Sequence, residues 1–142
     1  MTPRRLAVVT IAGTAIELAV DRHWGGIVRL IPWVALAALV VGLVVVDRWH
    51  RVACGVAFAV ALSGLFGIWE HVHENYETAP LDFRYSTRWA SMSEVSRWWA
   101  AINGSVGPAP LLAPGILVLA AAMVWWTASE RSTRQGALSP AR

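Results

Sequence analysis

Four long runs of apolar residues divide this chain, and they limit its fold more than any other feature. The runs lie at 6–20, 27–46, 52–69 and 111–127, with charged residues between them. A helix needs about 20 apolar residues to cross the hydrocarbon core of a bilayer. The chain is 15% charged, whereas ordinary soluble domains have about 25% charged residues. The pattern predicts an integral membrane protein.

We therefore expect an all-α fold, an integral membrane four-helix bundle that forms a single domain over residues 1–142. The predicted first span is the weakest, because Glu17 interrupts its apolar run. A tail at 129–142 is expected after the last span. The four predicted spans cover about 5–22, 27–46, 52–71 and 109–128.

The polar segment at 75–107, between the third and fourth predicted spans, carries a helix signal of its own. Apolar residues recur at three- and four-residue spacing from Trp89 to Ile102, and Asn103–Gly104 supplies a stop signal. This spacing predicts an additional, extracytoplasmic amphipathic helix that lies in the membrane interface.

The arginines predict the orientation. All 12 basic residues are Arg, and most lie near the ends of the predicted spans. Arginines before the first span, between the second and third, and after the fourth share one side, which the positive-inside rule places in the cytoplasm. We predict a multi-pass protein of a bacterial cytoplasmic (inner) membrane with both termini cytoplasmic. The lipid bilayer is then its main partner, and the scattered arginines favour no nucleic-acid partner.

Tryptophans fall near the ends of the predicted spans, at the level where amphipathic rings anchor a helix in the headgroup region. Of the nine tryptophans, only Trp33 lies clearly inside a predicted span. The predicted membrane-interface anchors are Trp24, Trp49, Trp69, Trp98, Trp99, Trp125 and Trp126.

Small residues recur every fourth position in the third predicted span, at Gly55, Ala59, Ser63 and Gly67. Such a stripe lets another helix approach closely. We interpret these four residues as a helix-packing seam. The partner helix belongs either to the same chain, to a second copy in a homo-oligomer, or to another membrane protein.

Acids and histidines gather at two predicted helix ends. The first and third spans run in the same direction in the predicted topology, so both ends lie at the outer membrane face. The topology thus brings distant segments into one layer and makes seven residues candidate metal ligands: Glu17, Asp21, His23, Glu70, His71, His73 and Glu74.

Metal binding is the first interpretation of this cluster. Imidazoles and carboxylates are ligands for zinc and also suit copper. The spacing Glu70–x–x–His73 is similar to the Glu–x–x–His element of di-metal sites in helix bundles. A divalent metal, zinc or copper, is therefore the candidate cofactor. The single cysteine, Cys54, excludes an intrachain disulfide and a multi-cysteine metal site.

Three other interpretations stay open. A carboxylate inside a span, such as Glu17, is costly and indicates proton-coupled transport; four short spans with an acid in the first resemble small multidrug-resistance transporters in outline. In a structural or partner-binding subunit without a ligand, Glu17 and Asp21 would instead pair with Arg22 or Arg29, and Glu70, His71, His73 and Glu74 would solvate a helix end. A membrane-embedded metal-dependent enzyme is the last alternative. We expect an accessory or transport-type protein with a metal- or proton-binding cluster, and we predict no catalytic residue.

The segment from His71 to Tyr76 and the proline-rich run at 107–115 loosely resemble short bacterial polytopic membrane proteins of unassigned function. The resemblance covers about the C-terminal half of the chain. It implies the same multi-span architecture and adds no chemistry.

Overall fold

The computed structural model describes residues 1–138, and within that range every regular element is a helix. Two single-turn 3-10 helices, η1 (Ala79–Leu81) and η2 (Trp89–Ser91), lie between the third and fourth α-helices. The expected all-α fold is confirmed. The α-helices are α1 (Pro3–Val20), α2 (Ile27–Val45), α3 (His50–Thr78), α4 (Glu94–Ile102) and α5 (Leu112–Leu138).

Three helices are long and apolar enough to cross a membrane, at Ile27–Val45, His50–Leu81 and Leu112–Thr133. By length and composition they indicate a membrane protein. The helix α1 has 18 residues but carries Arg4, Arg5 and Glu17, and its charge density separates it from the other three.

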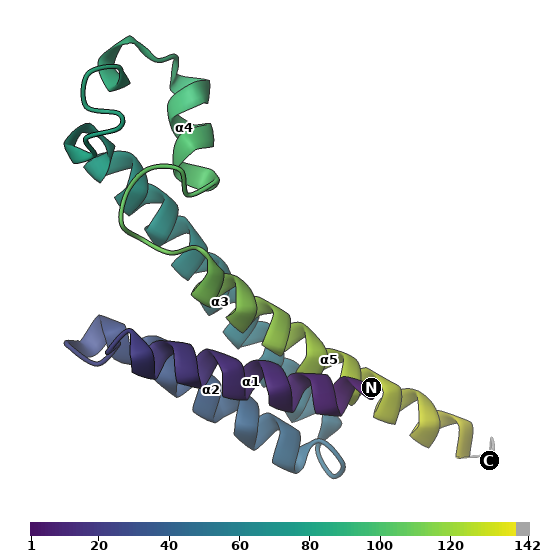
Figure 1. The fold of residues 1–142 in the computed structure, drawn as a ribbon. Helices are drawn as coiled ribbons and strands as arrows, with labels where there is room; N and C mark the ends of the chain where they lie inside the picture. Colours follow the sequence, from purple (N-terminus) through teal and green to yellow (C-terminus); the bar gives the residue numbers. More distant parts are fainter. Residues whose placement is uncertain (139–142) are drawn as a thin grey trace.

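Figure 1 shows that the long helices form two antiparallel pairs. The helices α3 and α5 lie side by side and make the most extensive packing in the structure, and α1 and α2 form a hairpin that packs against them. The pairs diverge towards the turn at 21–26. We call residues 72–111, at the far end of α3, the cap, and the opposite end, around the turn at 46–49, the base.

One carboxylate joins three elements at the base. Asp47, between α2 and α3, accepts a hydrogen bond from Arg4 of α1 at 3.1 Å and forms an ion pair with Arg131 of α5 at 3.0 Å. Arg4 also donates to the Leu43 carbonyl at 3.4 Å. All three charged side chains are about half exposed, so each pair contributes at most about 1 kcal/mol. We infer that they fix the register of the helices more than they stabilise them.

Small residues form the seam between α3 and α5. Ala53, Ala57 and Gly64 of α3 are buried, as is Ala121 of α5. A Cβ atom at Gly64 would lie 2.7 Å from Cγ2 of Val118. The absence of a side chain at Gly64 therefore lets Val118 of α5 pack directly against the α3 backbone.

The predicted packing stripe lies beside this seam. Gly55 and Ala59 are exposed, Ser63 lines a cavity described below, and Gly67 reaches α5, where its Cβ would be 3.3 Å from Cβ of Pro114. Small residues occupy several faces of α3, and a shift of two positions turns a helix by about 200°. The predicted stripe therefore meets the seam between α3 and α5 only at Gly67. A seam with another chain at Gly55 and Ala59 stays a prediction.

The segment at 75–107 folds into a cap that contains the predicted amphipathic helix as α4. Asn75 is completely buried, donates to the Ala109 carbonyl at 3.0 Å and accepts from the Ala109 N–H at 2.9 Å. Gly107 has φ +82°, and a Cβ there would lie 2.3 Å from Oδ1 of Asn75. The side-chain amide of Asn75 thus holds the segment before α5 against α3. The buried apolar residues of the cap are Val72, Ala79, Trp89, Ala100, Ala101 and Val106.

The helix α4 has apolar residues on two sides. On one side, Trp98 stacks on Tyr76, with ring centroids 4.3 Å apart, and on Trp69, at 5.9 Å. On the other side, Val95 and Trp99 are exposed. The predicted amphipathic helix therefore exists, but packing against the end of α3 determines its position.

The last turns of α3 support this cap. With 29 residues, α3 is about 44 Å long, which exceeds the hydrocarbon core of about 30 Å. The helix α3 continues seven residues beyond the end of the predicted third span, 52–71. The predicted tail at 129–142 begins as a continuation of α5 to Leu138, and residues 139–142 lie outside the described range.

We expect Gly64→Ala to lower the free energy of unfolding by about 1–3 kcal/mol, because the methyl group overpacks the seam. The matched change Gly55→Ala meets no atom within 4 Å and should be neutral or stabilise by up to about 1 kcal/mol. Thermal unfolding of both variants in detergent micelles measures the difference. Equal melting temperatures would contradict the assignment of the seam.

Candidate functional site

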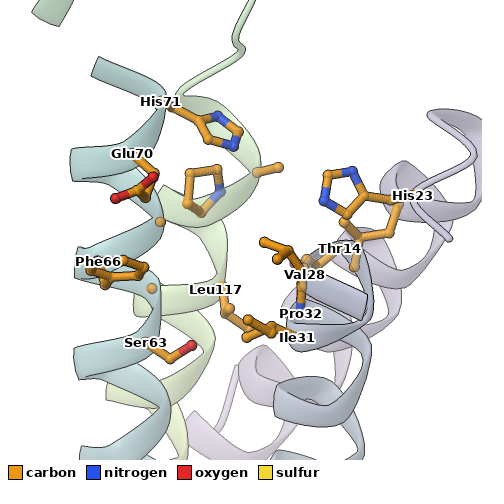
Figure 2. Close-up of a pocket in the computed structure, with 15 residues that line it drawn as sticks. Thr14, His23, Val28, Ile31, Pro32, Ser63, Phe66, Glu70, His71 and Leu117 are labelled. Carbon is orange, nitrogen blue, oxygen red and sulfur yellow. The ribbon is translucent and has the colours of Figure 1, made fainter. Parts of the chain in front are cut away.

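A cleft lies where the two helix pairs diverge. Its volume is about 140 Å³, and α1, the turn at 21–26, α2, α3 and α5 all line it. Figure 2 shows Leu117 of α5 at the inner end of the cleft and Phe66 of α3 along one wall. Val28 and Ile31 line the opposite wall, on α2. The interior of the cleft is therefore mainly apolar.

Two histidines stand on opposite sides of the mouth of this cleft. His71 lies on α3 and His23 in the turn that follows α1, and their rings point towards each other across the gap (Figure 2). Burial lowers the pKa of His23, and the positive charges of Arg29 and His71 lower it further, while Asp21 acts in the opposite direction more weakly. His23 is therefore a neutral imidazole at pH 7.

The cap holds His71 in place. Nδ1 of His71 forms a short hydrogen bond with the Pro110 carbonyl. A carbonyl only accepts, so Nδ1 carries the proton, and Nε2 of the neutral ring is left as an acceptor. Pro110 follows Ala109, which Asn75 binds through both backbone groups. The ring orientation of His71 thus depends on the same amide that holds the cap together.

The α1–α2 hairpin positions His23. The indole N–H of Trp33 donates to the His23 carbonyl at 2.9 Å, so the side chain inside α2 fixes the preceding turn. Arg29 folds back over this turn, because a Cβ at Gly25 would lie 3.3 Å from its guanidinium nitrogen. Arg22 adopts φ 50°, a left-handed conformation that turns the chain sharply before His23.

The structure separates the two predicted histidines of α3. His71 faces the cleft, whereas His73 forms an ion pair with Glu77 at 3.1 Å and stacks on Trp69, with ring centroids 6.0 Å apart. Residues two positions apart on a helix differ in direction by about 200°. Glu70 lines the cleft, but its carboxylate points away from His23 (Figure 2).

The remaining predicted ligands do not join the histidines. Glu17 is partly exposed, and Asp21 and Glu74 are exposed. In the part of the chain that the structure describes, none of the three forms an ion pair, so the expected pairing of Glu17 or Asp21 with Arg22 or Arg29 is not observed. No three His, Cys, Asp or Glu residues among the described ones lie close enough to hold a metal ion.

The predicted tryptophan anchors differ in their exposure. Trp98 packs inside the cap. The other six are between 45% and 65% exposed, as side chains that contact a bilayer would be: Trp24, Trp49, Trp69, Trp99, Trp125 and Trp126. Trp33, which the sequence left without a role, positions the turn that carries His23.

The arrangement combines an apolar cleft with two imidazoles at its mouth. It can hold an apolar chain inside and a proton or a polar group at the mouth. Comparisons of the chain with family models, curated proteins and solved structures found no match.

The lowered pKa of His23 makes the stability of the fold depend on pH. Below the unfolded value of 6.5, the unfolded chain binds a proton that the folded chain does not, so stability falls with pH until the folded pKa is passed. We expect the melting temperature to fall between pH 7.5 and pH 5, and to fall less in His23→Gln. His50→Gln, at the base, is the control that should keep the wild-type slope. Identical slopes for wild type and His23→Gln would contradict this prediction.

Proposed function

We propose that this chain is a small membrane protein of the accessory or transport type, in which the cleft is a ligand-binding site controlled by a proton on the His23–His71 pair. One observation carries the proposal. Two imidazoles from distant segments face each other at the mouth of an otherwise apolar cleft. Imidazole is the side chain best suited to bind and release a proton under physiological conditions, which is the chemistry that a proton-coupled membrane protein uses.

We assign α1 as a fourth span, so that four helices cross the bilayer. Its 18 residues extend about 27 Å, close to the core thickness of about 30 Å. Its charges lie near its ends, with Arg4 and Arg5 in the first turn and Glu17 in the last, where long side chains reach the interface at little cost. Ala7, Ile11 and other residues of its inner face are buried in the bundle core.

The positions of the arginines and the thickness of the hydrocarbon core also orient the protein. Five arginines lie at or near the base, and the positive-inside rule places such an end in the cytoplasm of a bacterial inner membrane. A core of about 30 Å corresponds to about 20 residues of α3, which places the outer boundary near Glu70. His23 and His71 then lie at the outer interface. The arginines at the base are Arg4, Arg5, Arg48, Arg51 and Arg131.

A proton is a better ligand for this site than zinc or copper. Zinc sites have at least three protein ligands, whereas only two of the seven candidate residues face each other across the cleft. A positive charge on His71 lowers the pKa of His23, so a proton on one imidazole opposes a proton on the other. The ligand-free structural subunit leaves the open cleft unexplained, and no residue of the cleft favours an enzyme over a binding site.

Single-cysteine labelling tests the four spans. In a Cys54→Ala background, Thr2→Cys should react with a membrane-impermeant maleimide only after the cells are permeabilised. Ser86→Cys, in the cap, should react on intact cells, and Ser132→Cys should behave like Thr2→Cys. Labelling of Thr2→Cys on intact cells would show that α1 does not cross the membrane.

Titration of the histidines by NMR tests the proton site. His71→Gln removes one of the positive charges that lower the pKa of His23, so the pKa of His23 should rise towards 6.5. His73→Gln is the matched control, because His73 lies on another side of α3. If His71→Gln and His73→Gln leave the His23 titration equally unchanged, the two imidazoles do not act as a pair and the proposal is wrong.

A further inference from the structure

We infer that the ligand of the cleft is a membrane phospholipid, with part of one acyl chain in the cleft and its phosphodiester at Arg29, His23 and His71. This inference rests on the proposed function, since it fills the same site. Three features of the structure lead to it: where the cleft opens, how deep in the membrane its mouth lies, and which charges surround that mouth.

The cleft opens sideways, between α2 and α3. Val28, Ile31 and Phe66 line it and are also 75%, 47% and 60% exposed on the outside of the bundle. In a bilayer these residues contact lipid tails, so the apolar lining continues onto the lipid-facing surface without a polar barrier. A water-soluble substrate would have to cross this apolar rim, whereas an acyl chain enters directly from the surrounding lipid.

The polar groups of the cleft lie at the level of lipid headgroups. His23 is in the turn beyond α1, and His71 lies one residue beyond the outer boundary deduced from the length of α3. Deeper in the cleft the lining is mainly apolar, with Leu18 and Leu117, and the hydroxyl of Thr14 donates to the Thr10 carbonyl of its own helix. The order of the side chains from mouth to interior therefore matches the order of headgroup and chain in a lipid.

The mouth carries both signs of charge, but the charges nearest His23 favour an anion, because the carboxylate of Glu70, which also lines the cleft, points away from His23. The groups that act on His23 are Arg29 from α2, His71 from α3 and Asp21 from its own turn, and Arg29 acts more strongly than Asp21. A phosphodiester remains anionic over the whole physiological range, so it pairs with Arg29 at any pH. Nε2 of His71 accepts hydrogen bonds while the ring is neutral and donates one to the phosphate when protonated. Acidification should therefore strengthen the contact.

Binding to the purified protein in detergent micelles tests this inference. The probes are dioleoylphosphatidylglycerol, dioleoylglycerol, which has the same chains without phosphate, and oleate, an anion without phosphate. We expect the phospholipid to raise the melting temperature more than either of the others. Arg29→Gln should weaken its apparent affinity about tenfold, the loss expected for one charge-assisted hydrogen bond. Arg48→Gln, at the base, is the matched control and should bind as the wild type does.

A second variant separates the site from general lipid binding. Ser63 lines the cleft and is partly exposed, so Ser63→Phe should fill the cleft, keep the fold and remove the stabilisation by the phospholipid. Equal stabilisation by dioleoylglycerol and the phospholipid, or equal loss in Arg29→Gln and Arg48→Gln, would overturn the inference. If oleate stabilises the protein at least as much as the phospholipid does, the site binds a fatty acid and the inference is wrong.

The two proposals fail separately. If the His23 and His71 titrations are coupled but no phospholipid binds through Arg29, the proton site stands and the lipid inference falls. If the phospholipid binds through Arg29 and the histidines titrate independently, the lipid inference stands and the proton-controlled function falls.

Discussion

The close contact between α3 and α5 is the constraint on which the other parts of this structure depend. At Gly64 a methyl group would overlap Cγ2 of Val118 and lie 3.3 Å from the Pro114 carbonyl oxygen, and the small buried residues on both helices extend this contact. The helix α3 continues beyond the start of α5 and carries the cap. The α1–α2 hairpin then packs against the pair, and its divergence from it creates the cleft.

The cap and the cleft are connected through a short chain of contacts. Asn75 binds both backbone groups of Ala109, and the neighbouring Pro110 carbonyl holds Nδ1 of His71. Buried polar groups need partners with good geometry, and a fully satisfied amide such as Asn75 rigidifies its surroundings. The cap is thus more than a cover over one end of the bundle, since it sets the tautomer and the direction of one of the two imidazoles at the mouth.

The sequence predicts the helices well and the site only in part. The lengths of the apolar runs predicted the four long helices, and most of the helix ends lie within a few residues of the predicted ones. Apolar runs of spanning length have few alternatives to a helix. The seam at Ala53, Ala57 and Gly64 was missed because small residues also occur on a second face of α3. The seven candidate ligands were predicted as one cluster, but in the structure only His23 and His71 face each other. Membrane depth predicts the level of a side chain but not its direction around the helix. Trp33 gave no signal, since its bond to the His23 carbonyl spans a turn whose geometry only the folded hairpin defines.

The restraints on the hairpin are unequal at its two ends, and this difference bears on how a proton could act. At the base, Asp47 links the hairpin to α5 through Arg4 and Arg131. At the opposite end, no side-chain hydrogen bond or ion pair in the described part of the chain joins the turn at 21–26 to α3 or α5. Like charges on His23 and His71 would repel each other at the end with fewer polar restraints, where a small rotation about the base changes the width of the cleft most. An anion between the two rings would offset that repulsion, so proton uptake and phosphate binding should favour each other at this site.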